Sequence, residues 1–307
     1  MNGSPIFHIG YHKTATTFLQ RALFETSPRF HRVVQRDIFW RLIYPHALEF
    51  DVESARQFVA DNVAMANDND SLAVFSNERL SGGHHTGGHD SLELAQRIRA
   101  CSPNARILLF VREQKSLLQS LYAQYVKGMG CASLAEYCNP SYTRHTKELF
   151  NPVTLEFDRL VSEYMKRFDQ VLVLPVEWLK ENPDEVLCRM LDFFGLPESR
   201  RAGLTLKSRR PRNVSRPATV RRIDRILHPL RSRNIPHVGS TYYNPVGRAF
   251  AGLTSRAVSL LPLQPLDRYF HGKERAYIEE FIGDRYSDSN RRLSKLIGMD
   301  LSTFGYS

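Results

Sequence analysis

The chain has 307 residues, of which 42% are hydrophobic and 24% are charged, and its formal net charge is +10 at pH 7. This composition is ordinary for a soluble globular protein with a substantial core. No uninterrupted apolar run approaches the roughly 20 residues of a membrane-spanning helix, and no signal peptide is visible. The four cysteines form neither a CxxC pair nor a cluster with zinc spacing. We therefore expect a cytoplasmic protein without a metal site.

Short apolar strands alternate with amphipathic helices along the first two hundred residues. Strands are predicted over residues 5–10, 71–76, 106–111 and 171–175. Helices are predicted over residues 14–25, 37–48, 53–66, 91–100, 113–127, 155–168 and 184–194. The glycine-rich stretch 82–88 is predicted to be a loop. This alternation predicts an α/β fold of the P-loop-like, three-layer type, with a central, mainly parallel sheet flanked by helices.

The later part of the chain has a different composition. Residues 199–270 are rich in Arg, Pro and Ser and predict a basic, loop-rich segment with one helix near 218–231. Residues 273–297 predict one long amphipathic helix that packs back on the core. No internal repeat is visible, so we treat residues 1–307 as a single domain that includes the basic segment.

The positive charge is concentrated in residues 199–233. This stretch contains twelve Lys and Arg against one acid, Asp224, so the remainder of the chain has a net charge of −1. Such a segment is expected to face an anionic ligand or surface. Nucleic acid, an acidic lipid surface, an acidic glycan, a phosphorylated cofactor and a merely solvated basic face all remain open at this point.

The stretch IFHIGYHKTATTFLQ, residues 6–20, joins the first predicted strand to the first predicted helix. A helix that begins after a strand offers unpaired backbone N–H groups and a positive dipole end to an anion. The turn also contains one mobile charge and three hydroxyls: Lys13, Thr14, Thr16 and Thr17. A triphosphate loop would have the form GxxxxGK[ST], and this turn is too short to wrap a triphosphate. A capped turn without a ligand remains the alternative.

The turn resembles the 5′-phosphosulfate loop of sulfotransferases, whose general form is P-K-x-G-T-T. Lys13, Thr16 and Thr17 match this form. His12 stands in place of the usual proline, and Ala15 stands in place of the usual glycine. Because alanine is tolerated in the first turn of a helix, we expect this second departure to cost little.

A second match lies downstream in VREQKSLLQSLYAQYV, residues 111–126. Arg112 ends the clearest core strand, and Ser120 follows eight residues later. In sulfotransferases an Arg and a Ser at this spacing bind the 3′-phosphate of 3′-phosphoadenosine 5′-phosphosulfate (PAPS). An arginine can bind a phosphate through two parallel hydrogen bonds, and a serine hydroxyl adds another donor.

Two further stretches extend the resemblance. Residues 171–197 resemble the family's strand, turn and proline-started helix, and residues 286–306 resemble the C-terminal helix and tail of bacterial members that act on carbohydrate. The resemblance covers most of residues 5–215 and 275–307, whereas residues 216–270 match nothing that we can name. It implies a PAPS-dependent sulfotransferase similar to the bacterial, carbohydrate-type members.

The resemblance also implies roles for particular residues. The reaction would move the sulfuryl group of PAPS to a hydroxyl or amine of a carbohydrate or glycolipid by in-line displacement, without a metal. Lys13 would offset the charge on the leaving group. The 5′-phosphate would be bound by the backbone amides of Thr14, Ala15, Thr16 and Thr17 and by the hydroxyls of Thr16 and Thr17. A late loop would close over the cofactor through Arg212, Asn213 and Ser215.

A general base must accept the proton of the acceptor. The best candidate is Glu78, because it follows the predicted strand 71–76 and so lies at the ligand-binding edge of the sheet. Several glycan-modifying sulfotransferases use a glutamate in this region, and the simple cytosolic ones use a histidine. The candidate acceptor contacts or alternative bases are His12, His84 and His85. A purely structural Glu78, paired with Arg79 or capping a turn, remains the alternative.

The eleven net positive charges of residues 199–233 exceed the need of the cofactor. We therefore expect an anionic carbohydrate or glycolipid acceptor, and we add peripheral contact with the inner face of the membrane as a further expectation. Two other functions are compatible with a basic, P-loop-like chain. A P-loop nucleotide kinase would need the missing glycine. A nucleic-acid-binding protein would need aromatic residues for base stacking within 199–233, and this stretch has none.

Overall fold

The computed structural model describes residues 3–127, 130, 132–139, 150–206, 217–223, 232–234, 241–243 and 264–306. Arg212, Asn213 and Ser215, which were predicted to close over the cofactor, lie outside these described residues.

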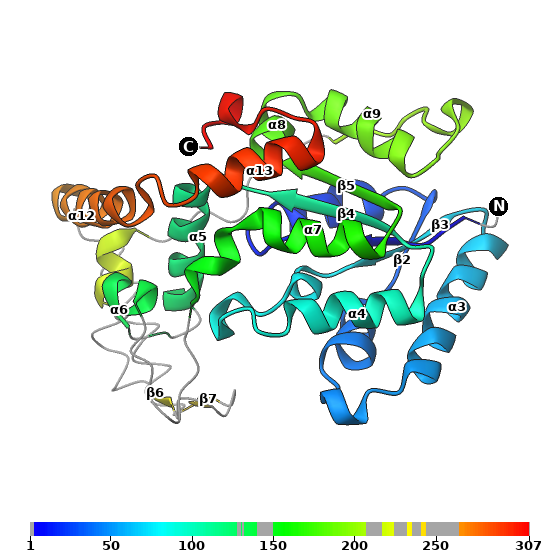
Figure 1. Ribbon diagram of the computed structural model, residues 1–307, viewed down its shortest axis with the longest axis horizontal. Helices are drawn as coiled ribbons and strands as arrows, with labels where there is room; N and C mark the ends of the chain where they lie inside the picture. The colour runs from blue at the N-terminus through cyan, green and yellow to red at the C-terminus, as the bar shows by residue number, and fades with distance from the viewer. Residues whose placement is uncertain are drawn as a thin grey trace.

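A five-stranded parallel sheet forms the centre of the molecule (Figure 1). Its strands are β1 (Ile6–His8), β2 (Phe30–Arg32), β3 (Leu72–Ser76), β4 (Arg106–Val111) and β5 (Gln170–Pro175). They lie in the order β2-β3-β1-β4-β5, and every neighbouring pair is parallel. The predicted α/β class with a central parallel sheet is therefore confirmed.

Helices cover both faces of this sheet because alternate strand residues point to opposite sides. One core contains Phe75 and Leu109 and packs against α3 (Val52–Asp68), α4 (Ser91–Cys101), α5 (Gln114–Lys127), α7 (Phe157–Arg167), α12 (Gln264–Ile282) and α13 (Ser287–Ile297). The other core contains Val74 and Phe110 and packs against α1 (Thr16–Leu19), η1 (Gln20–Phe24), α8 (Val176–Glu181) and α9 (Pro183–Phe193). Burial on both faces explains why these strands read as continuous apolar runs.

Shorter elements complete the described part of the chain. The short α-helices are α2 (Gln35–Ile38), α6 (Leu134–Cys138) and residues 218–223. A π-helix, η2 (Phe39–Ile43), follows α2 directly. The 3₁₀ helices are η3 (Ala47–Glu49), η4 (Glu78–Ser81), η5 (His84–Thr86), η6 (Pro152–Leu155), η7 (Glu198–Arg200) and η8 (Leu301–Phe304). Strands β6 (Ser232–Asn234) and β7 (Thr241–Tyr243) pair antiparallel.

The parallel register brings three polar segments to the same edge of the sheet. His8 of β1 is aligned with Ser76 of β3 and with Leu108 of β4. The chain leaves these strands through residues 9–15, 77–90 and 112–113, which all follow strand C-termini. Ligands of open α/β sheets bind at this edge, so the topology places the predicted anion turn, Glu78 and Arg112 on one side of the molecule.

Three predicted helices differ from the observed ones. In place of one helix over residues 37–48, the chain forms α2 and η2, which end at Ile43, and then η3. The first helix begins at Thr16 rather than at residue 14, because the backbone before it is left-handed. Residues 273–297 belong to two helices, α12 and α13, rather than to one. The chain is interrupted after Ile282, where Gly283 has a φ of +44°, a conformation that glycine adopts readily and that ends a helix. Strand β2 was not predicted, because three residues are too few for a periodic pattern.

Candidate active site

The turn between β1 and α1 has a strained backbone. Lys13 has a φ of +66° and Ala15 a φ of +64°, and the left-handed conformation costs a residue with a Cβ roughly 1–2 kcal/mol. Ala15 is the N-cap of α1 and lies outside its first turn. The expectation that alanine here is nearly free of cost is therefore wrong, because this position favours glycine.

A small polar cradle surrounds the Cα of Gly10. A Cβ at this position would lie 3.1 Å from Thr14 Oγ1, 3.1 Å from Thr16 Oγ1 and 3.2 Å from His8 Nε2. The Thr14 hydroxyl donates to the Tyr11 carbonyl at 2.5 Å. Thr16 Oγ1 and His8 Nε2 are buried and have no hydrogen-bond partner in the described part of the chain. Buried polar atoms are rarely left unpaired, so this turn fits a polar ligand such as a phosphate.

Positive charges converge on the turn. The Arg112 Nη1 atom donates to the carbonyl of Lys13 at 3.2 Å. Burial lowers the pKa of Lys13, the Lys127 charge lowers it further, and the Glu78 carboxylate raises it. These effects show that Lys127 and Glu78 are electrostatic neighbours of Lys13. Sequence reasoning missed Lys127, since only the packing of α5 brings the last residue of this helix towards the turn.

Arg112 is held in place by the start of α5. Its Nε atom donates to Ser116 Oγ at 3.0 Å. The predicted partner, Ser120, follows one helical turn later on the same helix and therefore lies on the same face as Ser116. Burial lowers the pKa of Arg112, while the carboxylate of Glu177 raises it. The geometry adds Ser116 to the predicted pair as the direct contact of the guanidinium.

Glu78 begins η4, which is separated from β3 by Asn77 alone. The Asn77 side chain caps this short helix by accepting a hydrogen bond from the backbone N–H of Arg79 at 2.9 Å. The Arg79 Nη2 atom binds Asp90 Oδ2 at 2.8 Å, so Arg79 is paired with Asp90. Glu78 itself is half-buried and close enough to Lys13 to act on its pKa.

A buried network holds the end of β3 against the anion turn. His8 Nδ1 lies 2.9 Å from Ser76 Oγ. The Gln20 amide donates to the hydroxyl and to the carbonyl of Ser76, both at 3.0 Å. All three side chains are buried. This network fixes the end of β3, the strand that precedes Glu78, relative to the helix that follows the turn.

Three histidines lie together next to Lys13. The ring centroid of His12 is 4.8 Å from that of His84 and 6.4 Å from that of His85. Burial lowers the pKa of His12 to about 3 and that of His85 to about 4, and nearby positive charges contribute. The rings are therefore neutral at pH 7 and can each donate and accept one hydrogen bond. The predicted acceptor contacts are thus brought together.

Other parts of the described chain contribute no metal site and no membrane span. Within it, no group of three or more His, Cys, Asp and Glu side chains could hold a metal ion. None of its helices is both long and apolar enough to cross a bilayer.

No protein-family model matches the chain, and no curated protein matches it in sequence. Among solved structures, it is similar to a sulfotransferase from Alicyclobacillus acidocaldarius, with a TM-score of 0.55 and 15% identity over 98% of each chain. It is also similar to the sulfotransferase domain of the curacin biosynthetic pathway, with 13% identity and a TM-score of 0.36 over 63% of this chain and 75% of that one. The first likeness shows that the chain has the α/β fold seen in a sulfotransferase.

Proposed function

We propose that this protein is a sulfotransferase that moves the sulfuryl group of PAPS to a hydroxyl, or an amine, of a carbohydrate or glycolipid. The observation that carries the proposal is the contact between the Lys13 turn and Arg112. It joins a compact cradle, suited to one phosphate, to a guanidinium suited to a second. A ligand with phosphates at two separate positions fits this pair better than a triphosphate chain does.

The proposal assigns binding roles to the residues at this edge. The backbone amides of residues 14–17 and the hydroxyls of Thr16 and Thr17 bind the 5′-phosphate. Arg112, with Ser116 and Ser120, binds the 3′-phosphate. The predicted lid residues are Arg212, Asn213 and Ser215. PAPS supplies the group to be transferred, and Lys13 offsets the negative charge that develops on the leaving side of the displacement.

We assign the role of general base to Glu78. Glu78 follows β3 at the edge of the sheet where ligands bind, and its carboxylate acts on the pKa of Lys13. The pKa values of about 3 for His12 and about 4 for His85 make these imidazoles weak bases at neutral pH. They are better suited to orient the acceptor hydroxyl, so we keep His12, His84 and His85 as acceptor contacts.

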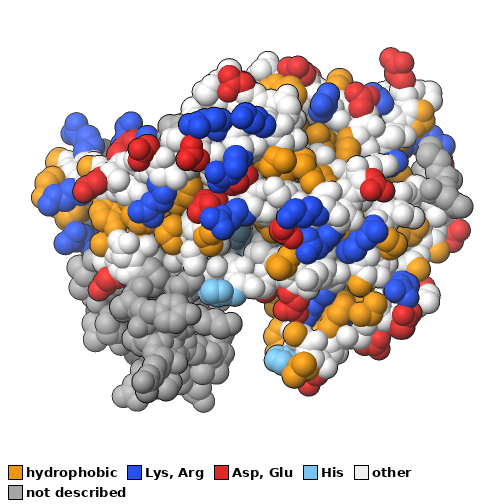
Figure 2. All heavy atoms as spheres, viewed as in Figure 1, with side chains coloured by type: hydrophobic (Ala, Val, Ile, Leu, Met, Phe, Trp, Pro, Cys, Tyr) orange, Lys and Arg blue, Asp and Glu red, His pale blue; other side chains and the backbone are white. Residues whose placement is uncertain are grey.

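The basic segment bears on the charge of the acceptor. Arg200 binds Asp70, Arg201 binds Asp192, and Arg221 binds Glu274, so part of its charge is neutralised within the protein. Figure 2 shows Lys and Arg side chains interspersed with Asp and Glu on one face of the molecule. The proposal of an anionic acceptor, or of contact with an anionic lipid surface, therefore depends on the remaining basic residues of 199–233.

The proposal is tested by thermal unfolding with 3′-phosphoadenosine 5′-phosphate (PAP) and with ATP. A ligand at about 100 times its Kd that binds only the folded state adds about 2.7 kcal/mol to the free energy of unfolding. We expect PAP to raise the midpoint and ATP to raise it less. The variant Lys13→Ala should weaken the PAP effect, whereas a control variant Lys180→Ala, on the exposed side of α8, should not. Stronger stabilisation by ATP would refute the proposal.

A further inference from the structure

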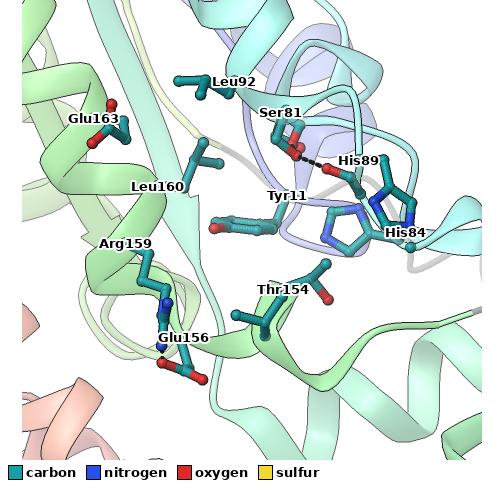
Figure 3. A pocket seen from close by; sticks show the side chains of 14 residues that line it. Tyr11, Ser81, His84, His89, Leu92, Thr154, Glu156, Arg159, Leu160 and Glu163 are labelled. Carbon is teal, nitrogen blue, oxygen red and sulfur yellow. Dashed lines mark hydrogen bonds and ion pairs between the residues drawn. The ribbon is translucent and has the colours of Figure 1, made fainter.

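A pocket of about 220 Å³ lies next to the histidine cluster, between residues 81–92, η6 and α7 (Figure 3). The buried ring of Tyr11 lies at its centre, between Leu160 and His84. Leu92 and Val153 extend the apolar lining. The pocket is smaller than the roughly 300–1,000 Å³ of sites for drug-sized ligands. Its size and lining therefore suit a single ring with a largely apolar surface.

His84 is a polar group inside this lining. It is only 2% exposed, and neither ring nitrogen makes a geometrically well-formed hydrogen bond among the described residues, although the Gly82 backbone lies near enough to oppose the lowering of its pKa. Its ring centroid lies 5.2 Å from that of Tyr11 and 4.8 Å from that of His12. Burial is the main cause that lowers the pKa of His84 well below its usual value, so the neutral ring can donate one hydrogen bond and accept another. A hydroxyl group matches this requirement.

The acidic and basic side chains that line the pocket are paired. Glu156 Oε2 binds Arg159 Nε at 2.6 Å. Glu163 binds Lys166 at 2.8 Å and Arg167 at 2.5 Å. An anionic ligand would lose its hydration in this pocket without gaining an unpaired cation in return, and that loss is costly. The lining therefore favours an uncharged ligand.

We infer that this pocket binds the acceptor, and that the part of the acceptor which enters it is an uncharged ring alcohol whose hydroxyl contacts His84. That the bound alcohol is the acceptor of the sulfuryl group rests on the proposed function, whereas the binding of an uncharged ring alcohol in this pocket does not. Because His84 contacts His12 and His12 precedes Lys13 in the chain, the pocket adjoins the anion turn. The inference narrows the acceptor class, since any acidic group of the acceptor must lie outside the pocket.

Three matched probes test the chemistry of the pocket: cyclohexanol, cyclohexyl methyl ether and cyclohexanecarboxylate. Their dissociation constants are measured with the full chain by ligand-observed NMR. We expect cyclohexanol to bind best, the ether about five-fold more weakly because it cannot donate a hydrogen bond, and the carboxylate at least about ten-fold more weakly. Equal or tighter binding of the carboxylate would overturn the inference.

Two variants locate the binding. Leu92 is 44% exposed, so the Leu92→Glu variant should fold. It should weaken the binding of cyclohexanol by about ten-fold or more, whereas Leu92→Met should retain this binding. His84→Phe keeps a ring of similar size and should remove the preference for cyclohexanol over its ether. Unchanged binding to Leu92→Glu would overturn the inference.

PAP stabilisation, measured on the same samples, separates this inference from the proposed function. Stabilisation by PAP without binding of cyclohexanol would refute the pocket and leave the proposed function intact. Binding of cyclohexanol without stabilisation by PAP would support the pocket as an alcohol site and refute its role in sulfuryl transfer.

Discussion

Replacing Ala15 by glycine should make the protein more stable, although the same change destabilises most sites. Ala15 has a φ of +64°, which costs a residue with a Cβ roughly 1–2 kcal/mol and glycine almost nothing. Against this gain stands the greater freedom of glycine in the unfolded chain, worth about 0.4–1 kcal/mol. The difference predicts that Ala15→Gly raises the free energy of unfolding by about 0.5–1 kcal/mol.

The assay is urea unfolding followed by circular dichroism, with Ala64→Gly as the matched control. Ala64 is exposed in the interior of α3, where glycine costs about 1 kcal/mol relative to alanine. The two variants should therefore shift the urea midpoint in opposite directions at an unchanged slope. If Ala15→Gly lowers the midpoint as Ala64→Gly does, the left-handed turn does not store strain and the reasoning fails.

The remaining predictions concern the turn and its surroundings. Gly10→Ala should leave the fold unchanged but abolish stabilisation by PAP, because the new Cβ would lie 3.1–3.2 Å from the polar atoms of the cradle; normal PAP binding would contradict this geometry. Arg112→Lys should weaken the binding of PAP by about ten-fold, since lysine cannot form two parallel hydrogen bonds to a phosphate. Isothermal titration calorimetry measures this change in the dissociation constant. Glu78→Gln should abolish transfer to the acceptor and spare PAP binding, so that lost PAP binding would count against its role as base. Burial lowers the pKa of His12 to about 3, so the unfolded chain binds this proton more readily than the folded one. The free energy of unfolding should therefore fall below about pH 6.5, with His12 alone contributing up to about 1.4 kcal/mol per pH unit, and His8, His84 and His85, whose pKa values are also lowered, add to this fall. His12→Gln should make that fall less steep in urea unfolding at pH 7, 6 and 5.

The local pattern of the sequence was sufficient to predict the fold class. Apolar runs such as residues 106–111 are buried on both faces of the sheet, and strand β4 spans that range. A parallel sheet places the C-terminal ends of its strands at one edge, so the strand positions were enough to predict that Glu78 would lie at the ligand-binding edge. Hydrophobic periodicity and strand direction are local properties, which is why they can be read without a structure.

Other features depended on contacts between distant segments. The contact of Ser116 with Arg112 and the effect of Lys127 on Lys13 both depend on how α5 packs at the end of β4. The low pKa of His12 results from burial among other residues, which no spacing along the chain can indicate.

The turn between β1 and α1 shows which features the sequence determined and which depended on the tertiary structure. Residue types and order led to the prediction of an anion-binding turn at Lys13, because a helix that begins after a strand offers unpaired N–H groups and this turn adds a lysine and threonines. The backbone conformation at Ala15 and the cradle around Gly10 became visible only in the tertiary structure. Dihedral angles in an irregular turn are imposed by the packing of β1 and α1 on either side, and not by the preferences of the turn residues themselves.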